Sequence, residues 1–492
     1  MNVDYALLTD LYQITMAQGY WDAEKAGEEA CFTMYFRDYP FKGGYAVACG
    51  MAQLADLVET FRFSEEDIAY LASLDAPAGG PLFDPAFLEY LRDLRLSVDI
   101  DAVPEGTIVF PHEPLVRVTG PIMQCQLIET ALLNMVNFQT LIATKAARVV
   151  QEAGGGVMEF GLRRAQGPDA GIYGARAAVI GGCAGTSNVL TGQMFNVPVL
   201  GTHAHSWIMS FPDEYTAFKT YAKMYPNSCT LLVDTYDVLK SGVPNAIRVF
   251  EEMREEGIQL THYGIRIDSG DLAYLSKEAY KMLAAAGFDD ATISASSDLD
   301  EYLIDSLKTQ DAKINSWGVG TNLITSKDNP AFGGVYKLAA VKDDGSSSFT
   351  PKIKLSENTE KVTNPGNKTV YRIYSKSTGK IKADLICLAD EVFDPEETMI
   401  IFDPTDTWKK TKVLGGTYEL RELLVPVIRE GKRVYTSPEV MDLRAYCQKE
   451  QNTLWDESRR LVNPQKVYVD LSQKLFDLKK NLLEEMSEKA LD

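Results

Sequence analysis

Histidine is scarce in this chain, whose 492 residues include only four. The seven cysteines are dispersed without a CxxC pair, so neither a disulfide framework nor a zinc knuckle is indicated, and a reducing compartment is expected. Positive charge is also in short supply, because 49 Lys and Arg residues face 69 Asp and Glu residues and leave a formal net charge of −20. This balance argues against general binding to nucleic acid or to an anionic membrane. Any phosphate site must therefore be a local cluster of basic residues.

Long apolar runs are missing as well. No stretch of about eighteen consecutive apolar residues occurs, and the start of the chain lacks the basic and apolar regions of a secretory signal. We therefore expect a cytoplasmic protein without a membrane span. The composition, with 45% hydrophobic and 24% charged residues, is that of an ordinary globular protein with a sizeable core.

The middle of the chain alternates between short apolar runs and helical patterns. Apolar residues recur at helical spacing from Pro121 to Ala153, where three glycines end the pattern. Seven expected strands follow, separated by amphipathic helical stretches; they cover residues 157–160, 197–201, 229–234, 263–268, 292–296, 314–319 and 335–341. Strands joined by helical crossovers pair in parallel, and this number of units favours closure. The pattern predicts an α/β fold built on a parallel barrel.

The two ends of the chain show other patterns. Near the start we expect helices over 9–21 and 51–61 and a strand over 30–36. Near the end we expect a hairpin of strands over 369–374 and 381–388, then an amphipathic C-terminal helix. Three domains follow from these differences: an N-terminal α+β domain over 1–130, an α/β barrel over 131–345, and a β-rich and helical region over 346–492 that packs partly on the N-terminal domain.

Polar residues gather where the expected strands end, which is where a barrel carries its active site. Such strand-end stretches lie at 160–164, 201–206, 234–237, 266–271, 296–298 and 318–322. Arg266 and Asp268 are two residues apart on one strand, so both side chains point to the same side. They form either a substrate-binding cation with a carboxylate that handles a sugar hydroxyl or a metal-bound water, or a structural ion pair.

The stretch after the sixth expected strand, Gly318-Val319-Gly320-Thr321, is a candidate phosphate cradle. Small residues let backbone N–H groups approach phosphate oxygens, and the hydroxyl of Thr321 adds a donor. Glycines at a strand end are at least as often ordinary turn residues. The pattern alone leaves both interpretations open.

Two of the four histidines, His203 and His205, are two residues apart at a strand end. Such a pair could ligate a metal in a barrel metallohydrolase. That class needs further histidines on later strands, whereas His112 lies in the N-terminal domain and His262 lies before its strand. A histidine in a barrel mouth can equally act as a base or a covalent carrier.

Taken together, these motifs resemble those of the nicotinate phosphoribosyltransferases, a type II phosphoribosyltransferase family of pyridine nucleotide salvage. The resemblance rests on six ordered motifs at 7–13, 159–164, 201–206, 266–271, 318–321 and 333–338. It implies an irregular parallel α/β barrel with an N-terminal α+β domain, in a homodimer whose subunits share active sites. It also implies conversion of nicotinate and 5-phosphoribosyl 1-pyrophosphate to nicotinate mononucleotide and pyrophosphate, with coupled ATP hydrolysis and with Mg²⁺ held mainly through the substrate.

The resemblance also assigns roles to individual positions. His205 matches the histidine that ATP phosphorylates. Tyr12 and Phe160 match the aromatic residues that sandwich the pyridine ring, with Tyr12 donated by the partner subunit. Thr202 and Arg266 match contacts to nicotinate. By its helical spacing alone, however, Tyr12 would lie on the apolar face of its helix, in the hydrophobic core.

Further positions complete the expected site. Thr321 matches a contact to phosphoribosyl pyrophosphate, and Gly318, Gly320 and Arg163 are expected beside it. Arg163 is also the next candidate to bind the nicotinate carboxylate. Asp268 lies where a carboxylate can stabilise an oxocarbenium-like ribose C1. Two other functions stay open, namely a metallohydrolase that uses His203 and His205 and a non-catalytic ligand-binding protein.

Overall fold

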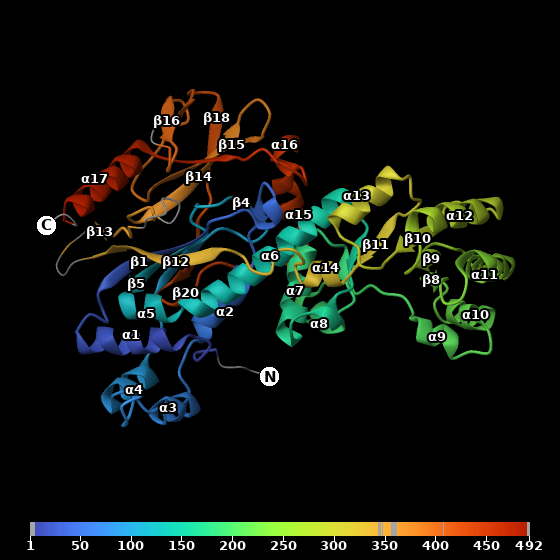
Figure 1. Ribbon diagram of the computed structural model, residues 1–492, viewed down its shortest axis with the longest axis horizontal. Coiled ribbons are helices and arrows are strands. Elements are labelled where there is room, and N and C mark those ends of the chain that lie inside the picture. The colour runs from blue at the N-terminus through green and yellow to red at the C-terminus, as the bar shows by residue number, and fades with distance from the viewer. Residues whose placement is uncertain (1–4, 343–345, 347, 356–361, 407, 490–492) are drawn as a thin grey trace. The chain divides into compact units, whose positions relative to one another are not determined.

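The computed structural model describes residues 5–342, 346, 348–355, 362–406 and 408–489 (Figure 1). Its contacts divide the chain into two compact units. Unit 1 comprises residues 1–141, 331–438 and 446–492, and unit 2 comprises residues 142–330 and 439–445. The two end segments that the sequence separates into domains thus belong to one unit, while unit 2 begins and ends near the expected limits of 131 and 345. Within the described ranges, no helix has the length and apolar character of a membrane span.

A six-stranded parallel sheet forms the centre of unit 2. Its strands follow the order β7-β6-β11-β10-β9-β8, and every neighbouring pair is parallel. They are β6 (Val157–Glu159), β7 (Gly185–Thr186), β8 (Cys229–Leu232), β9 (Tyr263–Ile267), β10 (Thr292–Ala295) and β11 (Ser316–Val319). Most of their residues are buried, because helices cover a parallel sheet and its strands become nearly continuous apolar runs.

This sheet is a half-barrel of six strands, which confirms the expected irregular parallel α/β barrel, although two of the expected runs are not among its strands. Residues 197–201 contribute only an isolated bridge between Thr186 and Val199. The run at 335–341 forms β12 (Gly334–Val341), which pairs antiparallel with β1 (Glu29–Phe36) in unit 1. An apolar run predicts a buried strand but does not show which sheet receives it.

Helices connect the strands of the half-barrel. They are α7 (Pro168–Ile180), α8 (Val189–Phe195), α9 (His205–Met209), α10 (Glu214–Met224), α11 (Val243–Glu255), α12 (Leu272–Ala285), α13 (Glu301–Thr309) and α14 (Thr321–Ile324), with the turns η2 (Leu162–Arg164) and η3 (Val238–Gly242). An aspartate side chain caps the first turn of three of them: Asp213 on α10, Asp271 on α12 and Asp300 on α13. These caps fix where each helix begins and therefore how the loop before it leaves its strand.

Unit 1 contains a seven-stranded sheet in the order β13-β12-β1-β5-β3-β19-β20. Its other strands are β3 (Asp99–Ala102), β5 (Val116–Pro121), β13 (Thr350–Pro351), β19 (Val425–Arg429) and β20 (Lys432–Arg433), and β2 (Ala46–Val47) pairs with β4 (Ile108–Val109). The helices are α1 (Leu11–Asp22), α2 (Met51–Thr60), α3 (Glu65–Ala72), α4 (Pro85–Asp93), α5 (Ile122–Leu127) and α6 (Glu129–Ala153), which continues into unit 2, with the turn η1 (Pro40–Lys42).

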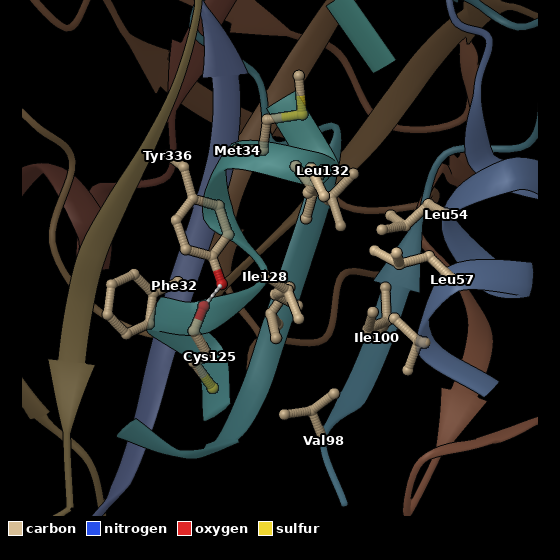
Figure 2. Close-up of a cluster of buried hydrophobic side chains, with 14 of the residues drawn as sticks. Phe32, Met34, Leu54, Leu57, Val98, Ile100, Cys125, Ile128, Leu132 and Tyr336 are labelled. Atoms are coloured by element: carbon tan, nitrogen blue, oxygen red, sulfur yellow. Dashed lines mark hydrogen bonds between the residues drawn. The ribbon is translucent and has the colours of Figure 1, made fainter. Parts of the chain in front are cut away.

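The main core of unit 1 lies between this sheet and its helices (Figure 2). Phe32 of β1 stacks on Tyr336 of β12, with ring centroids 4.9 Å apart, and the Tyr336 hydroxyl donates to the Cys125 carbonyl of α5 at 2.9 Å. Burying a tyrosine is favourable only when its hydroxyl is bonded, so this contact fixes α5 against the sheet.

The C-terminal part of unit 1 builds a second sheet in the order β17-β16-β21-β15-β14-β18. It contains β14 (Lys368–Ser375), β15 (Ile381–Leu388), β16 (Met399–Phe402), β17 (Lys410–Val413), β18 (Tyr418–Glu422) and β21 (Tyr468–Leu471), followed by α17 (Gln473–Lys489). Two more helices, α15 (Val440–Gln451) and α16 (Asp456–Arg459), precede β21. The expected hairpin is the antiparallel pair of β14 and β15, and the expected C-terminal helix is α17.

Candidate active site

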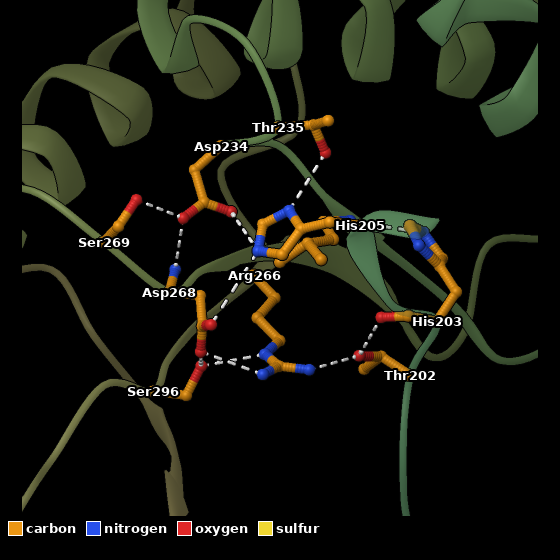
Figure 3. Close-up of polar contacts among 10 residues, drawn as sticks. Thr202, His203, His205, Asp234, Thr235, Arg266, Asp268, Ser269 and Ser296 are labelled. Atoms are coloured by element: carbon orange, nitrogen blue, oxygen red, sulfur yellow. Dashed lines mark hydrogen bonds and ion pairs between the residues drawn. The ribbon is translucent and has the colours of Figure 1, made fainter. Parts of the chain in front are cut away.

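Arg266, on β9, is the centre of a polar cluster at the carboxyl ends of the half-barrel strands (Figure 3). Its Nε donates to Ser296 Oγ at 2.8 Å, Nη1 donates to Thr202 Oγ1 at 2.9 Å, and Nη2 donates to Asp268 Oδ1 at 2.9 Å. Three separate segments therefore hold one guanidinium. Parallel strands bring their carboxyl ends to one edge, which explains why residues distant in sequence meet here.

Asp268 lies beside Arg266, as the spacing of two residues predicts. Its Oδ1 accepts hydrogen bonds from both Arg266 and the Ser296 hydroxyl. Partial burial would raise the pKa of this carboxyl, but the Ser296 hydrogen bond and the Arg266 charge outweigh that effect and lower the pKa below its ordinary value. Asp268 is therefore a carboxylate at neutral pH, and its Oδ2 stays on the side of His205.

His205 is the first residue of α9, and its ring lies among Thr235, Asp234 and Asp268. Nδ1 forms a hydrogen bond with Thr235 Oγ1 at 3.1 Å, while Nε2 is 4.0 Å from Asp234 Oδ1 and 3.8 Å from Asp268 Oδ2. The ring is 41% exposed, so an incoming group can reach it. One nitrogen is thus oriented by a hydroxyl and the other faces two carboxylates.

Asp234 is a buried carboxylate whose two oxygens have different surroundings. Oδ2 accepts the Asp268 backbone N–H at 3.0 Å and the Ser269 hydroxyl at 2.6 Å. Oδ1 accepts no hydrogen bond from the described residues and faces His205 Nε2. A buried carboxylate oxygen without a donor is costly unless a proton or a cation reaches it.

His203 points away from His205, so the two rings do not converge on one point (Figure 3). His203 is buried, its Nε2 accepts the Leu232 backbone N–H at 3.3 Å, and its ring packs edge-on against Tyr221 with centroids 4.7 Å apart. Burial lowers the pKa of its imidazole to about 4, so the ring is neutral. In the part of the chain that the structure describes, no three His, Cys, Asp or Glu side chains are placed to hold a metal ion. The two histidine rings have different partners and do not converge, so they do not form the metal-binding pair that the metallohydrolase alternative requires.

Phe160 follows β6, and the Arg266 guanidinium carbon lies 5.7 Å from the centroid of its ring. Gly318 of β11 lies against the same ring: a Cβ added there would come within 2.7 Å of Phe160 Cδ2 and 2.9 Å of Cε2. This packing accounts for Gly318 without a phosphate, and its expected role as a phosphate contact stays a prediction.

A buried carboxylate holds the turn that carries Phe160. Glu159 accepts the Gly161 backbone N–H on one oxygen and the Thr186 hydroxyl, at 2.6 Å, on the other. Burial raises the pKa of Glu159, and these two hydrogen bonds act in the opposite direction. The sequence places Glu159 near the end of an expected strand and at the start of the motif at 159–164, but it does not indicate that the carboxylate holds the turn.

The remaining expected residues are placed as follows. Gly320 and Thr321 begin α14, where the Asn322 side chain donates to the Asp298 carbonyl at 2.6 Å. Arg163 lies exposed in η2, and no contact joins it to the Arg266 cluster among the described residues. Tyr12 belongs to unit 1, where it is 48% exposed on α1, so its ring is not the core residue that helical spacing alone suggests.

Four residues of the cluster have no individual role in the sequence analysis: Asp234, Thr235, Ser269 and Ser296. All four lie in strand-end stretches that the sequence analysis names only as whole stretches. Their individual roles depend on which strands are neighbours, because Ser296 meets Arg266 only through the parallel pairing of β10 with β9. Position in a stretch does not supply that information.

Comparisons with known proteins identify one family along nearly all of the chain. The model of the nicotinate phosphoribosyltransferase (NAPRTase) N-terminal domain matches residues 7–137, the NAPRTase family model matches residues 156–375, and the C-terminal domain model matches residues 367–479. The chain is 46% identical to nicotinate phosphoribosyltransferase of Bacillus subtilis over 98% of both proteins.

Comparison with solved structures leads to the same family. Human nicotinic acid phosphoribosyltransferase is 33% identical, with a TM-score of 0.82 over 97% of this chain and 100% of that one. The nicotinate-nucleotide pyrophosphorylase of Pyrococcus furiosus is 22% identical, with a TM-score of 0.68 over 92% of this chain and 97% of that one, and shares the fold. With this identity and coverage, and with the half-barrel cluster of Arg266, Asp268 and His205 in place, the chain belongs to the nicotinate phosphoribosyltransferase family.

Proposed function

We propose that this protein is a nicotinate phosphoribosyltransferase, which converts nicotinate and 5-phosphoribosyl 1-pyrophosphate to nicotinate mononucleotide and pyrophosphate. The observation that carries the proposal is the arrangement of Arg266, which is fixed by three partners next to the ring of Phe160. A cation beside an aromatic face matches a ligand that is a flat ring bearing a carboxylate. The family relationship supports the same substrate.

The N–H groups of the Arg266 guanidinium show how this side chain would bind that carboxylate. A guanidinium has five N–H groups, and three are engaged, one each on Nε, Nη1 and Nη2. The two that remain are on the two terminal nitrogens, which can form a pair of parallel bonds to one carboxylate. Thr202 adds a hydroxyl beside them. A neutral amide would satisfy this pair less well than a carboxylate.

Phe160 would hold the pyridine ring by stacking. Because Gly318 has no side chain, the phenyl ring of Phe160 has room to lie where it can stack on that ligand. The pyridine nitrogen is already a nucleophile when neutral, so the transfer needs no general base. This fits a cluster that offers a cation, hydroxyls and carboxylates but no nucleophile–base pair of the hydrolase kind.

Asp268 would act at the ribose. As pyrophosphate leaves, C1 becomes oxocarbenium-like, and a carboxylate nearby stabilises the positive charge. The lowered pKa of Asp268 keeps it ionised for this purpose. Gly320, Thr321 and Arg163 are the candidates for the phosphate oxygens, with Arg163 as the second candidate for the nicotinate carboxylate.

The donor set fits Mg²⁺ held mainly through the substrate, with a smaller contribution from the protein. Mg²⁺ prefers oxygen ligands and usually binds through one or two carboxylates together with phosphates and waters. Asp234 Oδ1, buried without a donor, and Asp268 Oδ2 are the two oxygens that would hold it. When bound there, Mg²⁺ neutralises charge on the leaving pyrophosphate.

His205 is the proposed acceptor of the γ-phosphoryl group of ATP. The Thr235 contact orients its ring, and its exposure leaves it accessible. Phosphorylated His205 would favour the state that binds phosphoribosyl pyrophosphate tightly, so ATP would be spent on affinity and not on bond making at C1. His205→Ala should abolish ATP hydrolysis and its stimulation of turnover, yet leave slow transfer without ATP. Retained ATP stimulation in this variant would contradict the role.

We also propose a homodimer in which Tyr12 of one subunit completes the ring site of the other. Its 48% exposed side chain on α1 is available for such a contact. Tyr12→Ala should then weaken nicotinate and nicotinamide alike, because stacking does not distinguish them.

One assay tests the function as a whole. The purified chain is supplied with nicotinate, phosphoribosyl pyrophosphate, Mg²⁺ and ATP, and nicotinate mononucleotide, pyrophosphate and ADP are measured. Nicotinate-dependent release of pyrophosphate is expected. Ligand-dependent stabilisation without turnover would instead identify a non-catalytic binding protein.

A further inference from the structure

The edge of the half-barrel sheet has a backbone donor that no strand receives. β8 is the last strand in the order and pairs only with β9. The N–H groups of Cys229 and Val233 donate to the carbonyls of His262 and Arg266 on that side. Leu232, one residue before Val233, therefore turns its N–H to the open edge, since alternate residues of a strand face opposite sides.

His203 fills this position. Its Nε2 accepts the Leu232 N–H at 3.3 Å, and Tyr221 and Phe218 of α10 pack against its ring. The imidazole replaces the carbonyl of a missing neighbouring strand. Neutral imidazole can accept on one nitrogen only, so this bond places the ring proton on Nδ1.

The same short segment carries two residues of the proposed site. Thr202, immediately before His203, receives the Arg266 Nη1–H at 2.9 Å, and His205, two residues after it, contacts Thr235 at 3.1 Å. Thr235 in turn lies three residues beyond Leu232. The hydrogen bond from the Leu232 N–H to His203 and the hydrogen bond between His205 and Thr235 thus join the same two segments, 202–205 and 232–235, at two points. The second of these contacts is drawn in Figure 3.

We propose that His203 is a positioning residue, which locks segment 202–205 onto the edge of β8 so that Thr202 meets Arg266 and His205 meets Thr235. The two histidines of the motif then have separate tasks: His203 holds the segment in register and His205 reacts. The kinetic part of this inference rests on the proposed function, whereas the structural part does not.

Hydrogen exchange tests the lock directly. In the wild-type chain the Leu232 amide should be protected although it lies on a sheet edge. His203→Leu removes the acceptor and should speed exchange of this amide at least about tenfold relative to the amides of β9, while His203→Gln, whose carbonyl oxygen can accept, should keep most of the protection. His262→Leu, the same change at an exposed histidine of unit 2, is the control and should change nothing. Unchanged protection of Leu232 in His203→Leu would overturn the proposal.

Kinetics separate positioning from simple stability. His203→Leu should lower ATP-dependent phosphorylation of His205 and raise KM for nicotinate, each by about 10- to 100-fold, as expected when reactive groups shift by about 1 Å. His203→Gln should stay within a fewfold of the wild type. Normal rates in a His203→Leu protein with a lowered melting temperature would show a merely structural residue and overturn the proposal.

Two outcomes would complicate these experiments: a variant that does not fold, and a wild-type chain without turnover. If His203→Leu does not fold, His203→Asn, whose amide is too short to reach Leu232, takes its place with the same expectations. If the wild-type chain shows no transferase turnover, the proposed function fails, and the exchange of Leu232 in the variants still decides whether His203 locks the segment.

Discussion

At the scale of single residues, the Arg266 guanidinium has to distinguish a carboxylate from an amide on the same ring. Lysine in its place keeps the charge but loses the paired N–H groups. Arg266→Lys should therefore raise KM for nicotinate and narrow its advantage over nicotinamide by about tenfold or more, because bidentate recognition of the carboxylate is lost. The measurement is kcat/KM for both substrates in both proteins. An unchanged ratio would mean that the carboxylate is read elsewhere, with Arg163 the next candidate.

Gly318 offers a second test at this scale, because its missing side chain leaves room for the ring of Phe160. A Cβ at this position would lie 2.7 Å from that ring, closer than real contacts allow, so Gly318→Ala must displace it. We expect KM for nicotinate to rise by about tenfold with a smaller effect on kcat, since stacking supplies ground-state binding. Gly27→Ala, at a glycine with open space around it, is the control. A higher KM for phosphoribosyl pyrophosphate alone would instead favour a phosphate contact at Gly318.

Some residue contacts could be predicted from the sequence and others could not. The pairing of Arg266 with Asp268 follows from their spacing on one strand, because alternate side chains share a face. The contact between Ser296 and Arg266 depends on the register of two strands, and the role of Glu159 depends on a turn folding back over its carboxylate. The spacing of apolar residues in the sequence indicates neither the register of two strands nor the path of that turn.

At the scale of elements, the same limit appears in the strands. Five of the expected runs are strands of the half-barrel, since buried parallel strands are nearly continuous apolar runs. The run at 335–341 is also a strand, but it pairs with β1 of the other unit. The run at 197–201 makes only one bridge, and His203 instead takes the edge donor of β8. A sequence pattern finds the strand and leaves its partner undetermined.

The packing of segment 202–205 on β8 should make the stability of the folded chain depend on pH, through the titration of His203. Burial lowers the pKa of His203 to about 4 from an ordinary 6.5, with the charges of Arg266 and His205 adding to the effect. The unfolded chain therefore binds more protons than the folded one between these values, and stability is present above pH 6.5 and is lost as the pH falls toward 4. A shift of this size corresponds to about 3 kcal/mol at most.

The measurement is the free energy of unfolding in urea at several pH values from 7 to 4.5, for the wild type and for His203→Gln. Other groups titrate in this range, so the comparison is the difference between the two proteins. The variant should lose less stability on acidification, because glutamine has no proton to gain. Parallel curves for the two proteins would show that His203 does not carry the acid sensitivity.

At the scale of the whole molecule, the chain builds unit 1 from three separate segments, two of which follow the half-barrel. β12 and β19 return to the sheet that β1, β3 and β5 begin, so one sheet joins residues more than 300 positions apart. The expected domains over 1–130 and 346–492 include partial packing of the second on the first but do not say that the two share a sheet, because composition changes along the chain mark segments and not strand partners. Unit 2 is recognisable in advance because its strands and helices are consecutive.

The proposal that two subunits share each ring site gives the last prediction. Tyr12→Ala damages the part of the site that unit 1 of the partner would supply, and Arg266→Ala damages the half-barrel part. If Tyr12 acts across the dimer, a mixed dimer contains one site in which both residues are intact and one in which both are missing. Random pairing makes about half of all dimers mixed, so refolding the two variants together should restore about a quarter of the wild-type activity at low nicotinate. Each variant refolded alone is the control and should show no gain. If Tyr12 instead serves the half-barrel of its own chain, every site in the mixture carries one damaged residue, and the mixture will be no more active than the average of its parents.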